Sequence, residues 1–151
     1  MLRKLLILIA LVTVGLGATG YALYLGNGAP ASSPISPVET ASGKPFVVKL
    51  HAQWCPVCLV TKDVWSDIAE AYADRVNLVV MDFTNDATTA ASWAEARRLG
   101  FGESFDEYGG ASGFIVVLDG RTREVTSAIG GSRDVGEYRT AIDDALKSAG
   151  R

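Results

Sequence analysis

Cysteine, histidine and positive charge are scarce in this chain of 151 residues, and each scarcity excludes a class of protein. Two cysteines, Cys55 and Cys58, are too few for a framework of structural disulfides. With a single histidine, His51, they also leave a closed four-ligand zinc site short of ligands. Residues 46–151 carry 11 basic and 16 acidic side chains, a net charge of −5, so we expect no nucleic-acid partner.

The amino-terminal segment contains a long hydrophobic run. Residues 5–25 hold no charged side chain, and as a helix they would span about 31 Å, close to the hydrocarbon core of a bilayer. Arg3 and Lys4 precede the run and favour a cytoplasmic amino terminus. We therefore expect residues 1–25 to form one transmembrane helix that anchors the chain and places the rest on the extracytoplasmic, periplasmic side.

A cleaved signal peptide is the alternative for this segment. The triplet 29–31, Ala-Pro-Ala, resembles a cleavage site, although the apolar run is longer than the usual signal core of about 7 to 15 residues. Cleavage would leave a secreted or periplasmic protein on the same side of the membrane. Residues 26–45 contain four of the five prolines, with serine and glycine between them, and are predicted to be a flexible linker.

Residues 46–151 alternate between the periodicities of strands and helices. Phe46–Leu50 is predicted to be a strand, and apolar residues at three- and four-residue spacing predict one helix from Cys55 to about Ala73. A second strand is expected over Val76–Phe83, with its core, 78–81, buried on both faces. A helix over Ala87–Leu99 would be capped by Asp86 and ended by Gly100.

The carboxy-terminal third predicts a hairpin and a last helix. After an irregular glycine-rich stretch, Phe114–Leu118 and Glu124–Ile129 are expected to pair antiparallel, and Asp134 with Glu137 forms a capping-box pattern before the last helix. The predicted order is β-α-β-α-β-β-α. It indicates an α/β fold with a mixed sheet, parallel first strands and helices on both faces.

The segment 52–58, Ala-Gln-Trp-Cys-Pro-Val-Cys, follows an apolar strand and opens a helix. In this position it resembles the active-site segment of thioredoxins, and residues from about 46 to 148 follow the element order of that superfamily. Among its members, the chain is most similar to membrane-tethered extracytoplasmic ones, such as the cytochrome c maturation thioredoxins and the carboxy-terminal domain of the electron transporter DsbD. The resemblance implies a thioredoxin-like domain over residues 46–151 and a protein-disulfide oxidoreductase.

The spacing of the two cysteines suits this chemistry. A cysteine at a helix amino terminus meets unsatisfied N–H groups, which lower its pKa, so Cys55 is the expected nucleophile. Cys58 lies nearly one turn later and can resolve the mixed disulfide that Cys55 forms. Pro56 and Val57 lie between them, and the resemblance implies that Trp54 walls the site. No cofactor beyond the redox-active cysteine pair is expected.

Three departures from the thioredoxin pattern bear on the site. Lys49 occupies the position of the family's buried acid, and we hypothesise that it tunes Cys58, the alternatives being a solvent-directed lysine or a pair with Asp82. His51 occupies an aromatic position, where packing is the usual role and a catalytic or ligand role the rarer one. No proline follows Pro56, so the family's cis-proline position, near Ser112, must adopt a trans conformation that glycine permits.

Several alternatives remain open at this point. The two thiolates could instead bind Cu(I), as in a metallochaperone, and the missing proline favours this reading because in the family it shields the cysteines from metals. A redox-inactive docking module is disfavoured by two intact cysteines. Three aromatic residues before Ser112 either line a substrate groove or fix the loop to the core: Phe101, Phe105 and Tyr108. Trp65 and Trp93 are expected in the core.

The expected partners follow from this assignment. They are thiol or disulfide proteins, a redox donor in the membrane, and the membrane itself through the amino-terminal helix, with the protein a monomer. A dedicated reductant held near its donor is favoured over an oxidant, since tethering raises the effective concentration of that donor.

Overall fold

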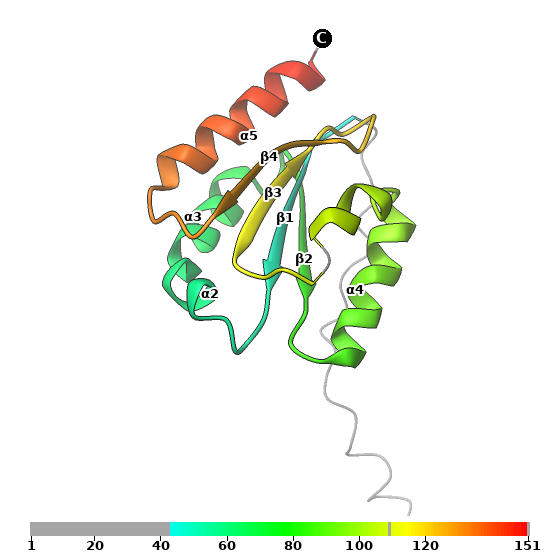
Figure 1. Ribbon diagram of the computed structural model, residues 1–151. Coiled ribbons are helices and arrows are strands. Elements are labelled where there is room, and N and C mark those ends of the chain that lie inside the picture. Colours follow the sequence, from blue (N-terminus) through cyan, green and yellow to red (C-terminus); the bar gives the residue numbers. More distant parts are fainter. Residues whose placement is uncertain (1–42, 109, 151) are drawn as a thin grey trace, which may run out of the picture. The chain divides into compact units, whose positions relative to one another are not determined.

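A computed structural model describes residues 43–108 and 110–150. The predicted membrane anchor (1–25) and nearly all of the predicted linker (26–45) lie outside these residues. No helix within the described ranges is both long and apolar enough to cross a membrane. The described residues form four strands, four α-helices and one 3-10 helix (Figure 1).

The elements follow the predicted order, with two additions. They are β1 (Phe46–His51), α2 (Pro56–Val60), α3 (Lys62–Tyr72), β2 (Asn77–Asp82), α4 (Asp86–Leu99), η1 (Glu103–Tyr108), β3 (Phe114–Leu118), β4 (Val125–Gly130) and α5 (Val135–Ala149). The strand order is β2-β1-β3-β4, with β1 parallel to β2 and both remaining pairs antiparallel. The predicted mixed sheet is therefore confirmed.

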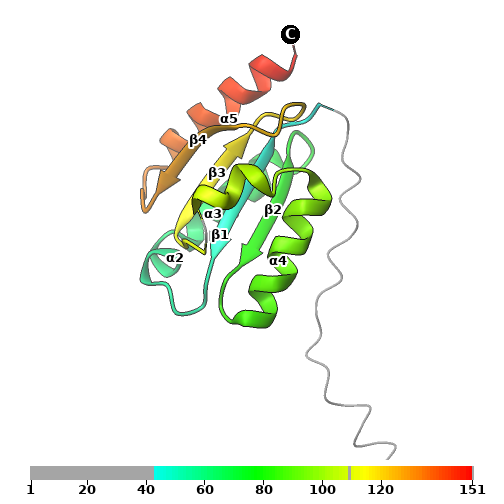
Figure 2. The same ribbon diagram turned by 45° about the vertical axis from the view of Figure 1, so that its right-hand side comes forward.

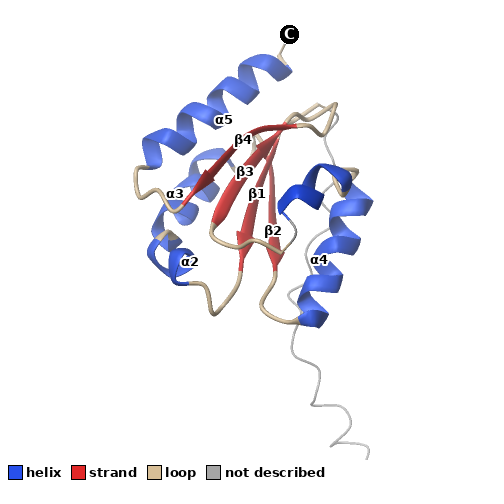
Figure 3. Cartoon of the chain, in the orientation of Figure 1, coloured by secondary structure: helices blue, strands red, loops and turns tan. Residues whose placement is uncertain are grey.

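Helices cover both faces of this sheet, as Figure 3 shows by colour. Helices α3 and α5 lie over one face, and α4 with η1 lies over the other, which the rotated view of Figure 2 makes clear. Alternate residues of β1 divide between the two layers: Val47 packs with Ile68 and Ile142, whereas Val48 packs with Met81. Two apolar layers thus hold β1, the strand that leads into the cysteine motif, at the centre of the domain.

The single helix predicted from Cys55 to about Ala73 is wrong, because the structure divides it at Thr61. The Thr61 hydroxyl donates to the carbonyl oxygen of Val57 at 2.8 Å, and its backbone has φ −102° and ψ 11°. A threonine hydroxyl that competes for a carbonyl of the preceding turn bends a helix. The short helix α2 is thereby set apart from α3.

Burial also differs from the sequence prediction at the strand edge and on α2. Val80 is 45% exposed, because β2 is an edge strand of the sheet, so the expectation that this strand is buried on both faces is wrong. On α2, Val57 and Val60 are 38% and 48% exposed, although their spacing placed them on the buried stripe. The apolar side chains of this predicted stripe are buried only from Val64 onward, where α3 packs on the sheet.

The helix caps are partly as predicted. Gly100 ends α4 with φ +85°, as expected, but the amino-terminal cap is Asn85 and not Asp86. The Asn85 side chain accepts from the Thr88 N–H at 3.1 Å, and the Thr88 hydroxyl accepts from the Asn85 N–H at 3.2 Å. Asp134 caps α5 as expected, through the Gly136 N–H at 2.8 Å. The predicted reciprocal box with Glu137 is absent, since the Asp134 N–H donates to Ser132.

Substitution at the two neighbouring positions separates these cap assignments. Asn85→Ala should lower the free energy of unfolding by about 1 kcal/mol, because the Thr88 N–H loses its acceptor. Asp86→Ala, the control, should cost only a few tenths of a kcal/mol, since Asp86 contributes only its charge near the helix start. Urea unfolding of the two variants measures both values, and a larger loss for Asp86→Ala would overturn the assignment.

Candidate functional site

The two cysteines lie where β1 ends and α2 begins. Cys55 is the N-cap of α2, Pro56 follows as the first helical residue, and the Cys55 sulfur accepts from the Cys58 N–H at 3.2 Å. Proline suits this position because its missing N–H would have no helical partner there. The Cys58 thiol donates to the carbonyl oxygen of Leu50, at 3.8 Å, on β1. Both cysteines are free thiols and 3% exposed.

The surroundings of the two thiols give them opposite pKa shifts. For Cys55, burial alone would raise the pKa, but the neighbouring Cys58 and Ser112 side chains and two backbone N–H groups favour the thiolate, outweigh burial and lower the pKa. For Cys58, burial and the neighbouring Cys55 raise the pKa above its ordinary value. The pair therefore consists of one thiol that ionises readily and one that resists ionisation.

Trp54 stands beside the cysteines as an exposed wall. Its side chain is 62% exposed, and its indole N–H donates to the carbonyl oxygen of Thr84 at 3.2 Å. The backbone N–H of Gln53 donates to the Thr84 hydroxyl at 3.0 Å. These two bonds join the loop before Cys55 to the loop that follows β2, so the indole is held at the rim of the site.

The loop that precedes β3 faces Cys55 from the other side. Gly113 donates its N–H to the carbonyl oxygen of Leu50 at 2.8 Å and accepts from the Gly131 N–H at 3.2 Å. A Cβ atom on Gly113 would lie 3.5 Å from the Cys55 sulfur and 2.9 Å from a methyl carbon of Val57. Among the described residues no peptide bond is cis, and Gly113 has φ +90°. Gly113 therefore occupies the position next to Cys55. The sequence predicts this position near Ser112, in a loop without a cis peptide bond.

The hydrogen bond from Ser112 is expected to control how easily Cys55 ionises. Ser112→Ala removes one donor and should raise the pKa of Cys55. Alkylation by iodoacetamide needs the thiolate, so its rate falls as the pH drops through the pKa, and the midpoint should move to higher pH in the variant.

The measurement is made in a Cys58→Ser background, where serine keeps a hydroxyl donor and only one thiol reacts. Ser127→Ala, on β4, serves as the control. An unchanged midpoint in Ser112→Ala would contradict the role of this hydroxyl.

Lys49 lies half-buried on β1, one residue before Leu50. Its Nζ atom lies 5.6 Å from the centre of the Trp65 ring, over the face of the indole. Burial lowers the pKa of Lys49, and the two cysteines, Cys58 more than Cys55, oppose that shift. None of the ion pairs between described residues includes Lys49, and the Asp82 carboxylate instead accepts from Thr84. The pairing with Asp82 that the sequence left open is therefore not formed.

His51 is half-buried at the end of β1. Within the ranges that the structure describes, its Nδ1 atom is buried and has no hydrogen-bond partner. No group of three or more histidine, cysteine, aspartate or glutamate side chains that could hold a metal occurs among residues 43–108 and 110–150. The two thiols therefore lack a third ligand in the described part, and a metal role for His51 stays a prediction.

The aromatic residues of the loop before β3 belong to the core. Phe101 and Phe105 are 1% exposed, with ring centres 5.1 Å apart, and Tyr108 packs against Phe105. Of the two sequence alternatives, the structure favours fixing the loop over lining a groove. Trp65 and Trp93 are partly buried against the two core layers, as expected.

Sequence reasoning missed the exposed apolar surface around the cysteines. Leu59 is 68% exposed, and with Trp54, Val57 and Val60 it surrounds the start of α2. The signal was present, because the five residues of α2 contain no charge, but helical periodicity assigned them to the core. A thiol bordered by apolar side chains is suited to contact a partner protein.

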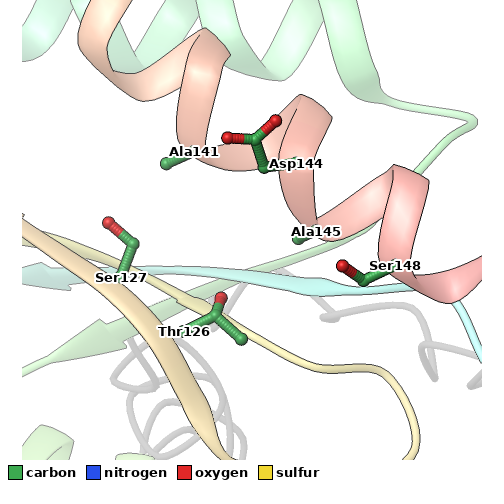
Figure 4. Close-up of a pocket in the computed structure, with 6 residues that line it drawn as sticks. All are labelled: Thr126, Ser127, Ala141, Asp144, Ala145 and Ser148. Carbon is green, nitrogen blue, oxygen red and sulfur yellow. The ribbon is translucent and has the colours of Figure 1, made fainter.

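The pocket between β4 and α5 is remote from the cysteine motif in sequence and contains neither cysteine. It encloses about 280 Å³ and is lined by Thr126, Ser127, Ala141, Asp144, Ala145 and Ser148 (Figure 4). The Thr126 hydroxyl already donates to the carbonyl oxygen of Val117 at 3.1 Å. The candidate site is therefore the cysteine region and not this pocket.

Comparison with known proteins gives the following matches. Residues 36–95 match the family model for thioredoxin. "Thioredoxin-like protein HCF164, chloroplastic" from Oryza sativa subsp. japonica is 42% identical over 53 residues, which are 33% of this chain and 20% of that protein. The match thus spans about a fifth of the length of that relative.

Two solved structures are also similar. Thioredoxin f from spinach chloroplast has 22% identity and a TM-score of 0.47, covering 78% of this chain and 89% of that one. Fasciola hepatica thioredoxin has 17% identity and a TM-score of 0.45, covering 69% and 83%.

Proposed function

The chain contains a thioredoxin-like domain with a close pair of cysteines, and on this premise we propose that it is a protein thiol-disulfide oxidoreductase. The observation that carries the proposal is the geometry of the cysteine pair: the Cys55 sulfur caps α2 and accepts the Cys58 N–H, while the Cys58 thiol donates to the carbonyl oxygen of Leu50. In this arrangement the pKa of Cys55 is lowered and that of Cys58 is raised. A thiol with a low pKa attacks the substrate disulfide, and a nearby thiol that stays protonated reacts only in the second exchange.

The reaction then proceeds in two exchanges. The Cys55 thiolate attacks one sulfur of a substrate disulfide, that S–S bond breaks, and the other substrate sulfur leaves as a thiolate and takes up a proton. Cys58 then loses its proton and attacks the Cys55 sulfur. A Cys55–Cys58 disulfide forms as the bond between Cys55 and the substrate breaks. The second substrate sulfur leaves as a thiolate and takes up a proton, and two electrons have passed from the pair to the substrate.

Several finer features belong to the same proposal. The uncharged run at 5–25, preceded by Arg3 and Lys4, supports a single-pass anchor with the domain on the extracytoplasmic side. Tethering favours a role as a reductant of disulfide-bonded proteins, with a donor in the membrane that returns the cysteine pair to its dithiol form. The proposed protein acts as a monomer and needs no cofactor beyond the cysteine pair.

A redox titration of the full-length chain in detergent micelles tests the proposal. The protein is equilibrated in dithiol and glutathione buffers, and free thiols are counted by alkylation and mass. We expect a reversible two-electron couple, nearer to about −270 mV for a reductant than to about −120 mV for an oxidant.

Two outcomes would overturn the redox assignment. Cysteines that stay in one state across all buffers would indicate a structural role. Cysteines that react only after a metal is removed would indicate the metal-binding alternative with Cu(I).

A further inference from the structure

Lys49 places a cation on the strand that contacts the resolving cysteine. Alternate residues of a strand point to opposite faces, so Lys49 shares with Val47 the face that α3 covers. The next residue, Leu50, supplies the carbonyl oxygen that accepts from the Cys58 thiol at 3.8 Å. The lysine side chain and the Cys58 sulfur are thus tied to adjacent residues of one strand.

Within residues 43–108 and 110–150, no carboxylate forms an ion pair with Lys49. Its strand neighbours in register are Val80 on β2 and Ile115 on β3, both apolar. From α3 it meets the Trp65 ring, and from β1 itself the nearest titratable group on the same face is His51. Among the described residues, the groups that can place negative charge beside it are the two thiols, Cys58 first.

We propose that the Lys49 ammonium stabilises the Cys58 thiolate when Cys58 resolves the mixed disulfide, so that a cation occupies the place where thioredoxins have an acid. This inference rests on the proposed function and names a positioning residue for its second exchange. The indole of Trp65 favours the charged amine, because the face of an aromatic ring attracts a cation.

The role is larger in the second exchange than in the first. Before the first exchange, the Lys49 charge is shared between two thiols. Once Cys55 is bound to a substrate sulfur, Cys58 is the only ionisable thiol that remains beside it. The Cys58 proton leaves to solvent, and the ammonium lowers the free energy of the thiolate left behind without accepting that proton.

The two exchanges can be timed separately with 5,5′-dithiobis(2-nitrobenzoate) on the full-length chain in detergent. Attack by Cys55 releases one coloured thiolate, and attack by Cys58 on the mixed disulfide releases a second. Lys49→Met should slow the second release roughly tenfold at pH 7 and move its pH midpoint upward by about one unit. The first release should change less than about twofold.

Three further variants show whether the charge is the cause. Lys49→Arg keeps the charge and should restore the second release to within about threefold of the parent protein. Lys49→Gln should behave as Lys49→Met, and it replaces that variant if thermal unfolding shows a loss of the fold. Lys62→Met removes an exposed lysine from α3, the helix that carries Trp65, and should leave both releases unchanged.

The outcomes separate this inference from the proposed function. If the parent protein gives no second release, the oxidoreductase assignment itself fails. If the parent gives two releases but Lys49→Met keeps the same rate and pH profile, only the role of Lys49 is wrong. A Lys49→Arg variant as slow as Lys49→Met would likewise reject the charge and indicate a packing effect.

Discussion

Cys55→Ser is expected to abolish disulfide reduction, with a loss on the order of 10³-fold or more, because the attacking thiolate is removed. Reduction of a disulfide-bonded protein by the dithiol form of the chain gives the rate. The Cys55 sulfur is the one whose pKa is lowered and which accepts the Cys58 N–H. A serine hydroxyl in that place stays protonated at neutral pH and does not attack sulfur.

Cys58→Ser is the matched variant and should fail at a different step. The first exchange remains, so the variant should accumulate a covalent mixed disulfide with its substrate, visible by mass and on a non-reducing gel. The double variant should accumulate none. The assignment would be reversed if Cys58→Ser turned over substrate and Cys55→Ser trapped it.

The second large effect is expected at Gly113, where backbone strain and a close contact coincide. With φ at +90°, an alanine there is strained by about 1 to 2 kcal/mol. Its Cβ would also lie 2.9 Å and 3.0 Å from two carbons of Val57. Since one of these is the Val57 Cβ, relief requires a shift of α2. We expect Gly113→Ala to lower the free energy of unfolding by about 2 to 4 kcal/mol.

Gly110→Ala provides the control for strain alone. Gly110 has φ +82°, and a Cβ there would meet nothing within 4 Å, so its loss should stay near 1 to 2 kcal/mol. Adding Val57→Ala to Gly113→Ala should recover part of the difference, because it removes the nearest methyl carbon. Equal losses for the two glycine variants in urea unfolding would show that the contact with α2 contributes nothing.

Gly113→Ala should also alter the chemistry of Cys55. The new methyl group would lie 3.5 Å from the Cys55 sulfur, in contact with it. The shift of α2 would also move the N–H groups that donate hydrogen bonds to this sulfur. Alkylation of Cys55 should therefore slow in this variant, whereas Gly110→Ala should leave it unchanged. The two readouts, stability and alkylation, thus report on one contact between the loop and the helix.

Local periodicity predicted the strands well, because their signals depend on neighbours in the chain. The strand Phe114–Leu118 has the predicted bounds, and Gly100 ends its helix as predicted. The cap of α4 was misassigned by one residue, since Asn85 and Asp86 are both good caps and only backbone geometry separates them. The break at Thr61 was missed because threonine is common within helices. It bends a helix only when its hydroxyl donates a hydrogen bond to a carbonyl oxygen of the preceding turn, which the sequence does not reveal.

The sequence by itself determined the element order and the cysteine pair at the start of a helix, since both follow from spacing along the chain. Only the tertiary structure decided which apolar residues face outward: α2 stands apart from the sheet, so Val57 and Leu59 surround the thiols instead of joining the core. It also placed Gly113 against Cys55 and the Trp65 ring under the Lys49 ammonium. Those contacts join residues far apart in the chain, and their geometry depends on how the helices pack on the sheet.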